Sequence, residues 1–233
     1  MSDQGCYVII GGTSGIGKAT AQLYHDRGHR VLISGRDLKR SKKIAGEIGD
    51  RVTGLALDLA DPEQIAAGLA DVGRVDGLVI AAIERDANTV KDYNLEGAKR
   101  LVTIKLVGYT EVIHTLLPKM TDACSVVLFG GLAKERPYPG STTVTSVNGG
   151  VTTMIRTFAT EMAPIRFNAI HPGIIGDSPA WENLEAALDA ARARTPGGQL
   201  ATTEDVVGSV DFLLTNKGVN GVNLFVDRGW VLT

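Results

Sequence analysis

Three glycines near the start of the chain, Gly11, Gly15 and Gly17, have the spacing of a phosphate-binding turn. The apolar residues 6–10 precede them and predict a strand, and a helical pattern over residues 18–24 follows. In a strand, glycine turn and helix of this kind, the backbone can approach a pyrophosphate closely, and the helix N-terminus offers unpaired N–H groups. A flexible turn that only starts a helix does not need all three glycines. The run therefore predicts a nucleotide site.

Strand and helix patterns that could position this site alternate along the rest of the chain. Apolar runs predict strands near 5–10, 30–34, 52–57, 75–81, 124–130, 165–170 and 222–226. Helical patterns lie between them, near 16–27, 37–48, 62–70, 97–117, 142–163 and 203–215. Such alternation predicts parallel strands, right-handed crossovers and helices on both faces. The predicted fold is α/β, a single doubly wound (Rossmann) parallel sheet of about seven strands in one domain over residues 1–233.

Composition limits the classes of partner. The chain has 233 residues and a net charge of −2, so no broad attraction to nucleic acid or an anionic membrane is expected. No apolar run reaches the ~18 residues of a membrane span, and no signal-peptide pattern precedes the first strand, which favours a cytoplasmic protein. Cys6 and Cys124 lie in apolar runs and are predicted to be buried thiols. The histidines show no metal-ligand spacing, so no metal site is expected.

The chain resembles the short-chain dehydrogenase/reductase family along essentially its whole length. The glycine run matches the TGxxxGIG pattern of that family, with Ile10 in place of Thr. Asp58-Leu59, which ends the third predicted strand, matches the acidic residue that the family has near the adenine of its cofactor. Further matches follow in the right order at residues 76–79 (DGLV), 166–173 (RFNAIHPG), 203–207 (TEDVV) and 226–229 (VDRG). The resemblance implies a doubly wound sheet with a nicotinamide cofactor at its switch point.

The resemblance also bears on which cofactor is bound. Family members that select NAD have an acidic residue at the end of the second strand, where this chain has Gly35 followed by Arg36. A guanidinium can bind a 2′-phosphate bidentately, whereas a carboxylate would repel it, so NADP(H) is predicted. The alternative is that Arg36 is a solvated loop charge; Arg40 could also come near if the loop curls back. The predicted cofactor-binding residues are Gly11, Thr13, Ser14, Gly15, Ile16, Gly17, Ser34, Arg36, Asp58, Leu59, Ala81, Ala82, Pro172, Gly173 and Ile175.

The resemblance fails at the residues that carry the family's proton transfer. The family uses Asn, Ser, Tyr and Lys, and alignment on residues 125–131 and on the preceding helix puts Lys105, Gly131, Val144 and Asn148 at those positions. No Tyr-x-x-x-Lys occurs anywhere in the chain. A valine cannot donate or accept a proton and a glycine has no hydroxyl. The usual combination of hydride and proton transfer is therefore not expected on this set.

Two residues are candidates to replace the missing catalytic groups. Lys105 is predicted to point into the pocket, where burial near a cationic nicotinamide would lower its pKa and make it a general acid; the alternative is a snorkelling surface or interface lysine. Tyr138 lies in the loop between the Gly131 and Val144 positions, and could be a substitute acid or only cap the pocket. His171 is expected to be a packing or loop residue, and Glu84, Arg85 and Asp86 a solvated turn.

Three functions remain open from the sequence. The first is an atypical NADP-dependent oxidoreductase acting on a small carbonyl-type or related substrate. The second is a non-redox NADPH-binding sensor, scaffold or partner protein, and the third a lyase or cyclase that uses the cofactor as structure. Residues 174–200, with Trp181, are the predicted substrate flap, and Trp230 is expected at a subunit contact. The family implies a homodimer or homotetramer built on helices 97–117 and 142–163, although the small residues there could instead serve packing within one chain.

Overall fold

A computed structural model describes residues 5–178 and 184–233 of the chain. Within them, seven parallel strands form one sheet in the order β3-β2-β1-β4-β5-β6-β7. The strands are β1 (Cys6–Ile10), β2 (Arg30–Gly35), β3 (Val52–Ala56), β4 (Val75–Ile80), β5 (Met120–Phe129), β6 (Arg166–Pro172) and β7 (Asn223–Val226). The order reverses direction between β1 and β4, so the crevice outside the carboxyl ends of these two strands is the topological switch point.

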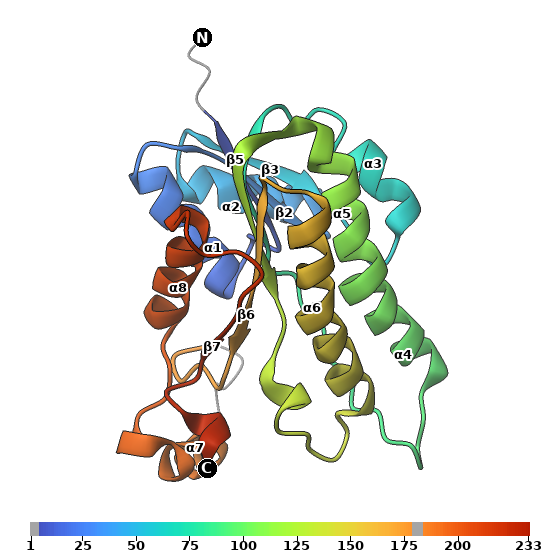
Figure 1. Cartoon of the computed structure of the whole chain (residues 1–233), viewed down its shortest axis with the longest axis vertical. Coiled ribbons are helices and arrows are strands. Elements are labelled where there is room, and N and C mark those ends of the chain that lie inside the picture. The colour runs from blue at the N-terminus through green and yellow to red at the C-terminus, as the bar shows by residue number, and fades with distance from the viewer. Residues whose placement is uncertain (1–4, 179–183) are drawn as a thin grey trace.

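Helices cover both faces of the sheet (Figure 1). One face carries α1 (Gly15–Asp26), α2 (Leu38–Ile48) and α8 (Thr203–Thr215). The other carries α3 (Ile65–Gly68), α4 (Leu95–Val102), α5 (Tyr109–Leu116) and α6 (Thr142–Glu161). The short helix α7 (Glu185–Arg194) lies with the C-terminus at the end of the sheet away from the N-terminus. Single turns complete the set: η1 (Pro62–Gln64), η2 (Thr103–Gly108), η3 (Leu117–Lys119), η4 (Leu132–Lys134), η6 (Pro196–Gly198) and η7 (Trp230–Leu232).

Alternating strand residues face two separate cores. In β1, Val8 and Ile10 belong to the core beneath α3, α5 and α6, whereas Ile9 belongs to the core beneath α1, α2 and α8. Burial on both faces explains why central strands such as β1 and β4 are continuous apolar runs rather than alternating ones. Cys6 and Cys124 are both buried and unbridged, as predicted.

The predicted Rossmann-type α/β fold is confirmed, with corrections to several elements. The predicted helix 97–117 is divided by a π-helical segment, η2, between α4 and α5. The predicted helix 62–70 is a 3-10 turn followed by the four residues of α3. Within the predicted flap, residues 174–200, the helix α7 begins at Glu185, while Trp181 lies outside the described residues. No helix in the described ranges has the length and apolar character needed to cross a bilayer.

Candidate functional site

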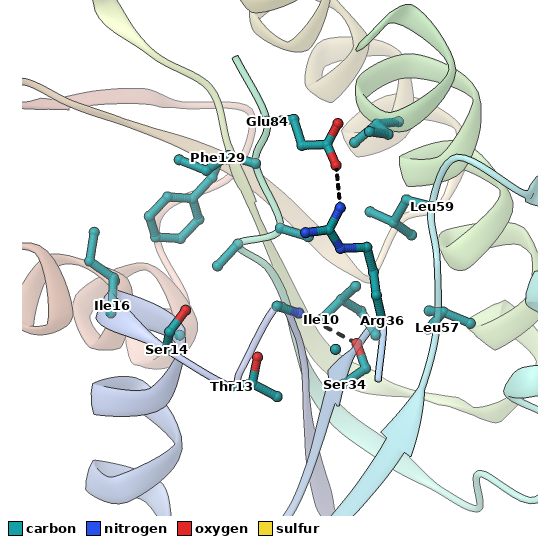
Figure 2. Close-up of a pocket in the computed structure, with 18 of the residues that line it drawn as sticks. Ile10, Thr13, Ser14, Ile16, Ser34, Arg36, Leu57, Leu59, Glu84 and Phe129 are labelled. Carbon is teal, nitrogen blue, oxygen red and sulfur yellow. Dashed lines mark hydrogen bonds and ion pairs between the residues drawn. The ribbon is translucent and has the colours of Figure 1, made fainter. Parts of the chain in front are cut away.

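A cavity of about 330 Å³ opens at the carboxyl ends of the central strands (Figure 2). It begins at the glycine turn after β1 and runs past the ends of β2 and β4 toward the end of β5. Its lining residues are Ile10, Gly11, Thr13, Ser14, Gly15, Ile16, Gly17, Ser34, Gly35, Arg36, Leu57, Asp58, Leu59, Ala81, Ala82, Ile83, Glu84, Ile104, Phe129, Ile175, Ser178 and Thr203. A cavity at this switch point is where open α/β sheets bind their ligands.

The N-terminus of α1 faces this cavity with its backbone donors uncompensated. Ser14 is the N-cap, but its side chain makes no capping hydrogen bond to the described residues, and no acidic residue lies in the first turn. The positive end of the helix dipole is therefore not neutralised by the protein. At Gly15, with φ +50°, an added Cβ would meet no described atom within 4 Å, so the backbone borders open space. This cradle fits an anionic group such as a pyrophosphate.

The turn before α1 is fixed by close packing of backbone against backbone. The amides of Gly11 and Gly12 donate to the Ser34 carbonyl over 3.2 and 3.0 Å, which joins the turn to β2. A Cβ on Gly17 would lie 2.2 Å from the Gly11 carbonyl oxygen, so α1 can approach the turn this closely only without a side chain there. Ser34 is buried beneath the turn, and its hydroxyl lies 3.4 Å from the Gly11 amide.

Charged groups meet at the mouth of the cavity. Arg36, from the end of β2, reaches Glu84 after β4 with 2.9 Å between Nη1 and Oε1 (Figure 2). Arg100 of α4 binds the same carboxylate through two hydrogen bonds of 2.7 and 2.8 Å and lies 3.7 Å from Asp58. The hydrogen bonds from Arg100 lower the pKa of Glu84 below its usual value. Glu84 is thus part of the cavity wall, which corrects the expectation of a solvated turn.

Lys105, in the π-helical segment η2, lies next to the cavity residues Ile104 and Phe129 but is not itself a lining residue in the described chain. Its side chain is 3% exposed, and its ammonium donates to the carbonyl oxygen of Phe129 at the end of β5. Tyr109, one helical turn on, donates to the Ala82 carbonyl over 2.9 Å and also approaches the Phe129 carbonyl. Burial, together with the charge of Arg85, lowers the pKa of Lys105 to about 7. Lys105 is therefore a buried group next to cavity residues and not a snorkelling surface lysine.

The three other positions aligned with the family's catalytic set lie near the end of β5. Val144 packs in a small apolar cluster with Leu101, Ala133 and Val147. Gly131 follows β5, and Asn148 of α6 directs its amide toward it: a Cβ on Gly131 would lie 2.7 Å from Asn148 Nδ2. Neither Gly131 nor Val144 presents an acid or a base to this space.

A chain of hydrogen bonds through His171 links Gly131 to Asn148. Its Nδ1 accepts from the Gly131 amide over 3.1 Å, and its Nε2 lies 2.8 Å from the side-chain oxygen of Asn223. Asn223 in turn donates to the Thr152 carbonyl, and the Thr152 hydroxyl donates to the Asn148 carbonyl. Burial lowers the pKa of His171 to about 4, so the imidazole is neutral and serves packing, as expected from the sequence.

Tyr138 lies away from the cavity. Its side chain is 48% exposed, it is not among the described lining residues, and its loop is fixed by hydrogen bonds of its backbone to the Ser141 hydroxyl. The geometry thus gives Tyr138 no place in the cavity. Arg136, in the same loop, donates to the Trp230 carbonyl and stacks 4.6 Å from the centre of its ring. Trp230, expected at a subunit contact, therefore contacts its own chain.

The structure brings together most of the predicted cofactor-binding residues. Thirteen of the fifteen line the cavity, whereas Pro172 and Gly173 are not among its described lining residues. Pro172 ends β6, and the Gly173 amide donates to the Val226 carbonyl. The predicted cofactor-binding set lacked nine of the described lining residues, which are Ile10, Gly35, Leu57, Ile83, Glu84, Ile104, Phe129, Ser178 and Thr203. Asp86, beyond Glu84, has the one buried side-chain oxygen of the described residues that lacks a hydrogen-bond partner.

Comparisons with known proteins agree with this geometry. A family profile described as enoyl-(acyl carrier protein) reductase matches residues 11–231. The 3-oxoacyl-[acyl-carrier-protein] reductase FabG of Thermotoga maritima is 32% identical, covering 97% of this chain and 97% of its own. Short-chain dehydrogenase/reductase malC of Malbranchea aurantiaca is 30% identical over 97% of this chain and 94% of its own. A solved structure of the MalC reductase/Diels-Alderase superposes with a TM-score of 0.90 at 28% identity, covering 99% of this chain and 98% of that chain.

Proposed function

The chain belongs to the short-chain dehydrogenase/reductase family, and we propose that it is an atypical oxidoreductase that binds NADP(H) and acts on a small carbonyl-type substrate. The observation that carries the proposal is the uncapped N-terminus of α1, which opens into the same cavity as Arg36. Ser14, Gly15 and Ile16 would hold the pyrophosphate, and Arg36 a 2′-phosphate. Relatives named as 3-oxoacyl-[acyl-carrier-protein] reductases support a carbonyl substrate.

A bound nicotinamide cofactor would supply the hydride donor or acceptor. The chain itself must orient the ligand, exclude water and handle a proton. Lys105 is the group suited to the last task, because a buried amine whose pKa is about 7 can hold or release a proton near neutral pH. Its ammonium retains further N–H donors besides the one that binds the Phe129 carbonyl. Tyr138 is not part of this proposal, because its side chain is 48% exposed and, unlike that of Lys105, makes no hydrogen bond to a residue that lines the cavity in the described chain.

Cofactor affinity tests the first half of the proposal. We expect tighter binding of NADPH than of NADH, and we expect Arg36→Ala to weaken NADPH binding roughly ten- to hundredfold, as for a lost charge-assisted hydrogen bond. NADH binding should not weaken. Arg40→Ala is the matched control, because Arg40 is exposed on α2 and does not line the cavity in the described chain. Equal affinities for the two cofactors in the wild type would contradict the assignment of NADP(H).

Turnover measurements test the second part of the proposal, that the protein is an oxidoreductase acting on a carbonyl-type substrate. NADPH oxidation is measured across a panel of ketones, aldehydes, imines and activated alkenes, with the wild type and with Lys105→Ala. We expect turnover of at least one carbonyl substrate by the wild type, and at least a hundredfold loss in the variant if Lys105 carries the proton. Full activity of Lys105→Ala would remove Lys105 from the mechanism.

A second candidate function is a non-redox NADPH-binding sensor or scaffold. One observation favours it: Val144 is packed in an apolar cluster, and the Asn148 amide lies where a side chain at position 131 would stand. A protein that keeps cofactor binding after losing its catalytic activity would have a site of this kind. The sensor is preferred if NADPH binds, no member of the panel turns over, and the affinity for a captured partner changes with NADPH.

A further inference from the structure

An ion pair between Arg36 and Glu84 joins two sides of the cavity (Figure 2). Arg36 follows β2 and Glu84 follows β4, and β1 lies between these two strands in the sheet. Both residues line the cavity. In a doubly wound sheet the adenosine half of a dinucleotide lies near the end of the second strand. The ion pair therefore stands at the adenosine end of the cavity.

The two members of this ion pair are held very differently. Both carboxylate oxygens of Glu84 already accept from Arg100, over 2.7 and 2.8 Å, and Arg36 adds one hydrogen bond of 2.9 Å to one of these oxygens. The side chain of Arg36 is 69% exposed, and within the described chain Glu84 is the one partner of its guanidinium. If Arg36 moved away, Glu84 would thus remain fully paired, whereas Arg36 would need a new partner.

The charges around Arg36 sum to zero before any ligand arrives. Arg100 also lies 3.7 Å from Asp58, so two guanidinium groups face two carboxylates in this cluster. A phosphate that enters the adenosine end therefore meets no surplus positive charge, and it must compete with Glu84 for Arg36. Such competition lowers the apparent affinity by the fraction of Arg36 that is already engaged.

A phosphate is the stronger competitor of the two anions. A phosphate monoester carries about 1.5 to 2 negative charges at neutral pH and has three acceptor oxygens, so a guanidinium can bind it through two hydrogen bonds. The carboxylate of Glu84 receives only one hydrogen bond from Arg36. The ribose hydroxyl that NADH has in place of the 2′-phosphate is neutral and cannot replace a carboxylate as an ionic partner. Only the phosphorylated cofactor can therefore take Arg36 from Glu84.

We propose that Glu84 is a specificity-determining residue that competes with the 2′-phosphate of NADP(H) for Arg36. The phosphate takes Arg36 from Glu84, and Arg100 is the positioning residue that keeps the Glu84 carboxylate paired after this exchange. With NADH, Arg36 stays on Glu84. Glu84 thus lowers the affinity for the phosphorylated cofactor selectively. The inference rests on the proposed function, since it requires that Arg36 binds a 2′-phosphate.

The substitution Glu84→Gln tests the competition, because it removes the charge and keeps a side-chain oxygen for Arg100. We expect NADPH and 2′,5′-ADP to bind about two- to fivefold more tightly, which is the contribution of an exposed ion pair expressed as an affinity ratio. NADH and 5′-AMP lack the 2′-phosphate and should bind as they do to the wild type. Titration calorimetry measures all four ligands.

Glu96→Gln is the matched control for the loss of one negative charge. Glu96 lies in the first turn of α4 with its side chain 81% exposed, and it does not line the cavity in the described chain. This change should alter none of the four affinities. An unchanged NADPH affinity in Glu84→Gln would overturn the inference. So would equal gains for NADPH and NADH, or an equal gain in the control, because either result would show an effect of charge alone.

A double-mutant cycle separates competition for Arg36 from direct repulsion between Glu84 and the phosphate. In the Arg36→Ala background no guanidinium remains to compete for, so Glu84→Gln should no longer strengthen NADPH binding. The same gain in both backgrounds would show that Glu84 acts on the phosphate without Arg36, contrary to the inference.

Two further observations separate the inference from a structural role and from the proposed function. The Tm of free Glu84→Gln should stay near that of the wild type, and Glu84→Ala should shift the ratio of NADPH to NADH affinity in the same direction. A lower Tm with weaker binding of all ligands would show a structural role and overturn the inference. If Arg36→Ala weakens NADPH binding but neither Glu84 variant strengthens it, the inference alone fails. If Arg36→Ala has no effect even in the Glu84→Gln background, the assignment of NADP(H) fails, and the inference with it.

Discussion

At the scale of single residues, Lys105 is a basic group that the fold removes from water. Its pKa is lowered from 10.5 to about 7 by burial and by Arg85. Below about pH 7 the amine is protonated in the folded and the unfolded chain, so the folded state bears the full cost of a buried charge. Between about pH 7 and pH 10.5 only the unfolded chain binds this proton, so folding becomes more favourable as the pH rises through that window.

Lys105→Met should therefore stabilise the protein in a pH-dependent way. We expect its gain in free energy of unfolding to be larger at about pH 6.5 than at about pH 9.5, with a difference on the order of 3 kcal/mol. Urea denaturation at the two pH values measures it. Lys99→Met, an exposed change on the adjoining helix α4, should show no such difference. The same gain for Lys105→Met at both values would refute the buried-charge account.

Sequence reasoning placed Lys105 near the pocket but could not assign its partner. The Phe129 carbonyl lies 24 residues along the chain, and only the packing of η2 against the end of β5 brings the two together. Glu84 was missed for the same kind of reason: a charged residue after a strand is typical of an exposed turn. Its partners Arg100 and Arg36 are 16 and 48 residues away in sequence.

At the scale of elements, the close contact between the glycine turn and α1 leaves no room for a side chain at position 17. Gly17→Ala would place a Cβ 2.2 Å from the Gly11 carbonyl oxygen, so α1 would have to shift away from the turn. We expect a loss of about 1–3 kcal/mol in unfolding free energy, measured by urea denaturation, and weaker NADPH binding.

Gly46→Ala in α2 is the matched control, because a Cβ there meets no described atom within 4 Å. It should stabilise the protein by about 0.5–1 kcal/mol through helix propensity. Destabilisation by both changes alike would mean that close packing at the turn is not the cause.

The spacing of apolar residues predicted the strands but not the π-helical segment η2. Apolar runs predicted all seven strands, and the signal is clearest in central strands such as β4, where burial on both faces leaves no alternation. The edge strands β3 and β7 are only partly buried. The π-helical segment was not predictable, because one widened turn barely changes the apolar spacing of a helix. That segment carries both Ile104, which lines the cavity, and Lys105.

At the scale of the whole molecule, we propose a homo-oligomer built on the helical layer of α4–α6. Val107 in this layer is 50% exposed, and Gly149 of α6 borders open space in the described chain. Gly150, by contrast, faces Leu106 of the same chain, so only part of the small-residue pattern is free for a second copy. The alternative of packing within one chain thus holds for Gly150.

Val107→Glu should convert the assembly to monomers, because it would bury a charge between the copies. Light scattering coupled to size-exclusion chromatography measures the mass. Phe212→Glu, on α8 at the other face of the sheet, is the control and should leave the mass unchanged. A monomeric wild type, or dissociation by the control alone, would contradict an interface on α4–α6.

His171 provides an internal reporter for this corner of the molecule. Its imidazole is fully enclosed and held at both nitrogens, by the Gly131 amide and by Asn223. A ring hydrogen held in this way exchanges slowly with water, so it should give a separate proton resonance far downfield of the amides. The same ring supports the strand end beside Asn148. A shift of this proton resonance during a ligand titration would therefore report binding near Asn148 without any label or added chromophore.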